Sequence, residues 1–273
     1  MRRAVGTRGW GFGAALAAVP ALALLARAEP ASPDFEGPSP YLVDVPTAGL
    51  PPDRAIETRG RVFPGGGMEL RVEAGILDRA SLGVGFGGLQ VIGDGTPDWY
   101  PRPGFALKAR VLEESWTLPA IAVGIDTRGS GVWDRRQNRF QYKSRGVFAV
   151  ASKNYRFLGD LALHGGASRS FETRDDGDPT LFGGLEKSLG PYAGLTVEYD
   201  LATNDNARDG VYGRGRGYLN ASIRLRPAPR VELRIMVRDM LDNTELDDPG
   251  RSDVVVDDGW GREVALTYMA TPF

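Results

Sequence analysis

Residues 68–76 read MELRVEAGI, a stretch in which apolar and charged side chains alternate. Successive side chains of a β-strand point to opposite faces, so this stretch predicts a strand with one apolar and one charged face. The apolar face carries Leu70, Val72, Ala74 and Ile76, and the charged face carries Glu69, Arg71 and Glu73.

The same alternation recurs along the rest of the chain. It predicts about twelve strands (range 10–14) of roughly ten residues, which is the length that a tilted membrane-spanning strand requires. Clear segments lie near residues 68–76, 81–87, 105–111, 121–126, 160–164, 195–200, 219–226, 231–238 and 263–268, and weaker ones near 56–63, 142–153 and 179–189.

The connections between these segments alternate in length. After the tight turn at 64–67 (PGGG), short connections such as 188–191 alternate with long polar ones such as 170–179 and 202–217. Short turns at one end and long loops at the other are typical of outer-membrane barrels. A soluble β-sandwich and a lipocalin-like barrel are the alternatives to a membrane barrel, and the predicted strands are long for either of them. We therefore predict an all-β fold, a single antiparallel transmembrane β-barrel over residues 53–273.

The N-terminus predicts export. Arg2, Arg3 and Arg8 precede an uncharged run at 10–26, and Ala26-Arg27-Ala28 ends it with small residues at the spacing of a cleavage site. This pattern indicates a Sec-type signal peptide over residues 1–28, with a membrane anchor as the alternative. Residues 29–52 are rich in proline and lack periodicity, so we expect an extended periplasmic lead-in there. The predicted location is the outer membrane of a Gram-negative bacterium.

Composition limits the partners. The net charge of −2 gives no electrostatic support for a nucleic-acid partner, and the absence of cysteine excludes disulfides. The final Phe273 is an aromatic end of the kind that outer-membrane assembly machinery recognises. The expected partners are outer-membrane lipid and lipopolysaccharide, the barrel-assembly machinery and, for one function considered below, a polysaccharide.

The polar faces of the predicted strands would line the barrel interior with charges of both signs. Buried charges must pair or stay hydrated, so two interpretations remain open. Cross-strand ion pairs fill a narrow lumen, or a hydrated lumen attracts an acidic solute. The candidate binding residues are Arg59, Arg61, Arg71, Glu73, Lys108, Arg110, Arg145, His164, Glu198, Arg224, Arg234 and Arg238.

Four glycines, at 83, 85, 87 and 88, fall in one predicted strand. Small residues on the inner face let a loop or the opposite wall approach closely, or they relieve curvature where the barrel bends, and we favour the second explanation.

Catalysis has little support in the sequence. The single histidine, His164, has Ser168 on the same face of its strand, but residues four apart on a strand are about 13 Å apart, too far for a hydrogen bond. Ser222 is another inward candidate that nothing distinguishes. We therefore predict no enzyme, no catalytic residues, no metal site and no cofactor.

Residues 46–93, together with 151–155, 182–186 and 198–200, resemble the YjbH-like family of outer-membrane proteins linked to exopolysaccharide production. The likeness extends loosely over residues 46–269. Its motifs are mostly glycine, aromatic and turn residues, which specify barrel architecture better than chemistry. The chain is shorter than typical members and would carry one barrel. The resemblance implies a role with exopolysaccharide and supplies no catalytic residues.

Three functions follow from this sequence. The first is a non-enzymatic barrel that supports export or passage of polysaccharide or small polar solutes. The second is a structural or adhesion-like barrel whose lumen is plugged by salt bridges. The third is a barrel enzyme that acts on lipid or lipopolysaccharide.

Overall fold

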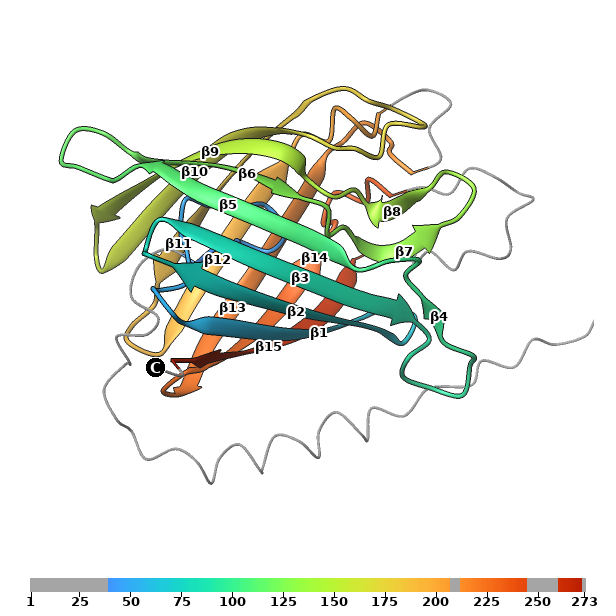
Figure 1. Cartoon of the computed structure of the whole chain (residues 1–273), viewed down its shortest axis with the longest axis horizontal. Coiled ribbons are helices and arrows are strands. Elements are labelled where there is room, and N and C mark those ends of the chain that lie inside the picture. The colour runs from blue at the N-terminus through green and yellow to red at the C-terminus, as the bar shows by residue number, and fades with distance from the viewer. Residues whose placement is uncertain (1–38, 207–211, 245–259, 272–273) are drawn as a thin grey trace, which may run out of the picture.

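The computed structural model describes residues 39–206, 212–244 and 260–271, and the predicted signal peptide lies outside them. Its main sheet holds thirteen strands, of which β4 (Asp98–Trp99) only extends the edge of β3, and the other twelve form a closed wall (Figure 1). The wall consists of β1 (Ile56–Phe63), β2 (Gly67–Ile76), β3 (Ala80–Leu89), β5 (Gly104–Leu112), β6 (Ala120–Asp126), β9 (Gly146–Arg156), β10 (Asp160–Arg169), β11 (Thr180–Ser188), β12 (Ala193–Asp200), β13 (Tyr218–Ala228), β14 (Val231–Arg238) and β15 (Gly261–Ala270).

The first and last strands close the wall. β1 pairs with β2 on one side and with β15 on the other, from Ile56 opposite Ala270 to Val62 opposite Val264. All the pairings are antiparallel, so every wall strand has two hydrogen-bonded neighbours. The predicted fold class is confirmed. No helix long and apolar enough to cross a membrane occurs among the described residues.

The alternation predicted from the sequence sorts the side chains between the two faces of the wall. Leu70 and Phe105 point outward and are 48% and 59% exposed, whereas Glu69 and Lys108 point inward and are 2% and 1% exposed. An apolar outer face suits contact with lipid, and a closed wall leaves no unpaired backbone groups there.

Connections of the two kinds lie at opposite ends. The end at which β1 begins has the short turns, such as 157–159 and 229–230, and the other end has the long loops together with the tight turn 64–66 between β1 and β2. The loop between β6 and β9 contains a hairpin of β7 (Ser130–Asp134) and β8 (Arg139–Tyr142). The sequence did not predict β4, β7 or β8, because strands of two to five residues are too short to show a period.

Residues 39–52 correct one expectation. The periplasmic lead-in predicted for 29–52 is described from Ser39 onward, and it lies inside the barrel, where Figure 1 shows its blue trace between the walls. Leu42, Val45 and Thr47 have no exposed surface at all. We call residues 39–48 the inner segment. It precedes β1, so it enters the lumen from the end that carries the short turns.

Candidate functional site inside the barrel

The inner segment forms a compact turn. The Leu42 amide donates to the Val45 carbonyl (3.0 Å), and the Thr47 amide donates to the Pro40 carbonyl (3.1 Å). These bonds double the chain back on itself between Pro40 and Pro46, neither of which has an N–H to donate. The tip of the turn carries Asp44, and the remaining backbone groups must find partners on the wall.

Glu198 on β12 accepts hydrogen bonds from the tip of this turn. The amides of Val43 and Val45 donate to its carboxylate at 2.8 and 3.0 Å, and the Asp44 amide donates at 3.0 Å. The Asn220 side chain donates to the other oxygen at 2.7 Å. Glu198 has no exposed surface. One buried carboxylate therefore satisfies three consecutive backbone donors, and charge-assisted bonds of this kind are the strong ones.

Asp44 is held between two arginines of the wall. Its carboxylate pairs with Arg61 on β1 at 2.8 Å and with Arg238 on β14. Burial raises the pKa of Asp44, but the guanidinium groups of Arg238 and Arg61 outweigh burial and hold that pKa well below its usual range. Both arginines also pair with Glu263.

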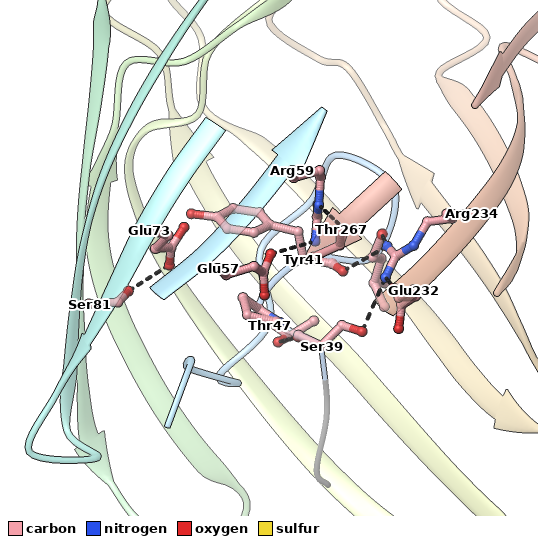
Figure 2. A network of polar contacts seen from close by, with 12 residues as sticks. Ser39, Tyr41, Thr47, Glu57, Arg59, Glu73, Ser81, Glu232, Arg234 and Thr267 are labelled. Carbon is pink, nitrogen blue, oxygen red and sulfur yellow. Dashed lines mark hydrogen bonds and ion pairs between the residues drawn. The ribbon is translucent and has the colours of Figure 1, made fainter. Parts of the chain in front are cut away.

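Cationic side chains bind the carbonyl groups of the inner segment. Lys108 donates to the Pro40 carbonyl at 2.8 Å, and Arg110 donates to the Ala48 carbonyl at 3.0 Å. Arg234 donates to the carbonyls of Tyr41, at 3.2 Å, and of Leu42 (Figure 2). The wall thus binds backbone atoms of the segment as well as its side chains.

Apolar contacts add to the polar ones. Leu42, Val45 and Ala48 pack in a buried cluster with residues on the inner face of β6, β9 and β11, including Val150 and Phe182. Complete burial of a Leu or Val side chain contributes roughly 1.5–3 kcal/mol. This patch explains why β9 is apolar on both faces.

The loop at 127–145 folds inward at the end of the barrel that carries the long loops. The Arg128 side chain lies over β3, where a Cβ added at Gly83 would be 2.6 Å from its Nη1 atom and one added at Gly85 would be 3.1 Å from its Cδ atom. Gly83 and Gly85 therefore leave room for a loop. The structure supports this explanation of the inward glycines and not the curvature explanation that we favoured. Arg71 donates to the Gly129 carbonyl at 3.2 Å and ties the same loop to β2.

All twelve candidate residues face the lumen or its mouth, but the structure divides them into two groups. Seven contact the inner segment: Arg61, Lys108, Arg110, Glu198, Arg224, Arg234 and Arg238. The other five pair with the wall or the external loops: Arg59 with Glu57, Arg71 with Glu69, Glu73 with Arg128, Arg145 with Asp200 and His164 with Ser152.

Three important residues were missing from the sequence prediction, namely Tyr41, Asp44 and Arg128. Tyr41 and Asp44 lie in the mostly apolar stretch YLVDV (41–45) inside a proline-rich segment. Apolar side chains are unexpected in a segment surrounded by water, so this stretch was a signal that the segment is buried. Arg128 gives no signal of its own, since it lies in a polar loop.

His164 contacts a serine that the sequence did not single out. Its Nδ1 atom lies 2.8 Å from Ser152 Oγ, and Ser152 Oγ also accepts the Ala48 amide at 2.8 Å. The His164 Nε2 atom is 3.7 Å from the Glu186 carboxylate, beyond hydrogen-bond distance. In this closed arrangement Ser152 joins the inner segment to the wall. The described residues contain no group of side chains arranged to hold a metal ion.

Arginine side chains line a small space between the inner segment and the wall. A cavity of about 10 Å³ lies beside Val43 and is lined by Arg59, Arg61, Arg71 and Arg234. A volume of this size has room for roughly one water molecule. The inner segment therefore occupies the lumen at this level, with room for little more than water beside Val43.

The charge of Asp44 predicts how closure depends on pH. Its pKa in the seated segment is lower than in a released one, so its contribution is complete above the ordinary pKa of about 3.9 and is lost as the pH falls through the lowered value. As far as Asp44 is concerned, we expect equal closure at pH 7 and pH 5 and weakening only below about pH 4. Protection of the segment's amides from hydrogen exchange, corrected for the intrinsic rate at each pH, checks it across this range, and a steep loss of protection between pH 7 and pH 5 that Asp44→Asn abolishes would contradict it.

A closed antiparallel barrel with an apolar exterior and a charged interior is the architecture of outer-membrane β-barrel proteins, and this chain has that fold. Among solved structures it is similar to the KdgM porin, with a TM-score of 0.50 and 14% identity over 78% of this chain and 98% of that one. It also aligns with the outer-membrane protein Omp33 of Acinetobacter baumannii, with a TM-score of 0.41 and 8% identity over 79% of this chain and 95% of that one. No family model and no curated protein matches the sequence. The resemblance to the YjbH-like family therefore stays a prediction.

Proposed function

We propose that this protein is a porin-like channel of the outer membrane, which passes small polar solutes when the inner segment leaves the lumen. The supporting observation is that the wall and its filling are separate. Each wall strand is hydrogen-bonded to two neighbours, whereas residues 39–48 fill the lumen and belong to no wall strand. The segment can therefore leave without exposing unpaired backbone groups of the wall to lipid.

The groups that the segment leaves behind indicate which solutes would be favoured. Withdrawal of Asp44 removes a carboxylate from Arg61 and Arg238, and withdrawal of Pro40 removes the 2.8 Å acceptor of Lys108. A lumen with uncovered cations attracts anionic solutes. We limit the proposal to small solutes, because a polysaccharide would also require displacement of the loop at 127–145.

We propose the outer membrane as the place where the channel acts. Export through a signal peptide at 1–28 would deliver the chain to the assembly machinery, and lipid and lipopolysaccharide would surround the apolar belt. We propose no catalytic step.

A disulfide that fixes the inner segment tests the proposal. The natural chain has no cysteine, and the Ala48 amide lies 2.8 Å from Ser152 Oγ. We expect the double variant Ala48→Cys/Ser152→Cys to conduct in planar bilayers when reduced, to lose at least about 90% of its openings when oxidised, and to recover with a reductant, because a disulfide holds its two Cα atoms within about 7 Å.

Each single-cysteine variant is the matched control and should conduct equally under oxidising and reducing conditions. An absence of conductance from the wild-type and reduced proteins, with any solute or voltage, would reject the channel. That result would favour a sealed structural barrel instead. The many hydrogen bonds and ion pairs between the wall and the inner segment support this second function.

A further inference from the structure

We propose that the emptied lumen binds phenolic acids, small aromatic carboxylic acids with a hydroxyl group on the ring, at the position that Tyr41 occupies in the closed state. The inference rests on the proposed function, because the inner segment must leave before such a solute enters. Tyr41 then marks the site that the solute would take.

The hydroxyl group of Tyr41 occupies a site that does not depend on it. It donates to Asp126 at 3.1 Å and accepts from Arg128 at 2.6 Å. Asp126 and Arg128 are also bonded to each other, at 2.9 Å between Oδ2 and Nη2, and Arg128 pairs with Glu73 at 3.3 Å. All these side chains are buried. The acceptor and the donor for a solute hydroxyl are therefore preformed.

The ring of Tyr41 lies beside two cations. Lys108 Nζ is 4.7 Å and Arg128 Cζ is 5.3 Å from the ring centroid. Figure 2 shows the ring extending from the inner segment toward the wall that carries Glu73. Cations within about 6 Å of a ring face are attracted to its π electrons. A saturated sugar ring has no such electrons, so this site favours an aromatic solute.

A carboxylate also has partners at this site. The Tyr41 carbonyl oxygen, three bonds from Cβ, accepts from Arg234 at 3.2 Å. Lys108 has no carboxylate oxygen within 4 Å among the described residues, and its acceptors are the carbonyls of Pro40 and Thr47, which leave with the segment. The compound 3-(4-hydroxyphenyl)propanoate has the carbon skeleton of tyrosine without the amino group. Its hydroxyl and carboxylate would thus match the groups that now bind Tyr41.

The ring site is tested on the full chain in detergent micelles. Tyr41→Ala leaves a void that p-cresol fills with a hydroxyl group and toluene fills without one. We expect calorimetry to give a dissociation constant at least about 10-fold lower for p-cresol, because a site built to hydrogen-bond a hydroxyl rejects the analogue that lacks it. Equal affinities would overturn the inference.

Phe182→Ala is the matched control variant. Phe182 is also buried in the lumen, with Arg145 Cζ 5.8 Å from its ring centroid, but it has no hydroxyl group. We expect its void to bind toluene at least as tightly as p-cresol. A p-cresol preference equal to that of Tyr41→Ala would show that any lumen void selects phenols, and it would overturn the inference.

The carboxylate is tested on the wild-type channel. We expect 3-(4-hydroxyphenyl)propanoate to raise the open probability at least about threefold more than 4-ethylphenol, which lacks only the carboxylate, because the acid also competes for Lys108 and Arg234. Equal effects of the two compounds reject the inference and leave the channel standing. A chain that never conducts rejects the proposed function, and the inference with it.

Discussion

Replacing Asp44 by alanine should open the proposed channel. The substitution leaves Arg61 and Arg238 buried with Glu263 as their shared carboxylate. Breaking a buried ion pair by removing one partner costs about 3–5 kcal/mol, and water that enters the lumen reduces this penalty. We expect the closed state to be destabilised by about 3 kcal/mol relative to the open state. This change raises the ratio of open to closed molecules roughly a hundredfold.

Single-channel recording in planar bilayers measures this ratio directly. Asp98→Ala is the matched control, because Asp98 also pairs with an arginine, Arg135, but both side chains are about half exposed or more (46% and 66%). An exposed ion pair contributes at most about 1 kcal/mol, so the control should leave the ratio nearly unchanged. Equal effects of the two substitutions would mean that Asp44 does not hold the lumen closed.

Glu198→Gln should release the tip of the inner segment while the wall stays folded. The substitution removes the charge that binds the amides of Val43, Asp44 and Val45 and places an amide group among three donors. Bonds to charged groups contribute about 1.5–3 kcal/mol each, and they are not additive here because they share one carboxylate. We expect the free energy that holds the inner segment on the wall to fall by about 3 kcal/mol.

Amide hydrogen exchange separates the segment from the wall. Protection of the three amides should fall roughly a hundredfold in Glu198→Gln, and protection of the β1 and β15 amides should not change, since these are bonded to each other. Glu114→Gln, a change at a partly exposed carboxylate that pairs with Lys153, is the control and should alter neither. A uniform loss of protection over the barrel would show that Glu198 supports the wall instead.

The wall was predictable because each strand repeats the same local rule. In MELRVEAGI the charged positions became the inner face and the apolar positions the outer face, with Glu69 buried and Leu70 exposed. The same rule located all twelve wall strands, and connection length separated the two ends. Local alternation suffices for such a fold, since a one-residue change of register would reverse both faces.

The filling of the lumen was not predictable in the same way. Ser39 to Ala48 shows no period, and its partners lie far along the chain, as the pairs Val43–Glu198 and Tyr41–Arg234 show. The inward positions of β9, occupied by Phe148 and Val150, gave one overlooked signal. Apolar side chains on a face that should meet water indicate that something covers it.

The place of the inner segment in the chain has a consequence for biogenesis. It comes before β1, yet its hydrogen-bond partners lie on strands as late as β14, at a sequence separation of 155 for Val43 and Glu198 and of 193 for Tyr41 and Arg234. Those partners meet around one lumen only when β15 has joined β1. Seating of the segment therefore cannot be complete before the wall has closed, and the first part of the described chain is among the last to find all its partners.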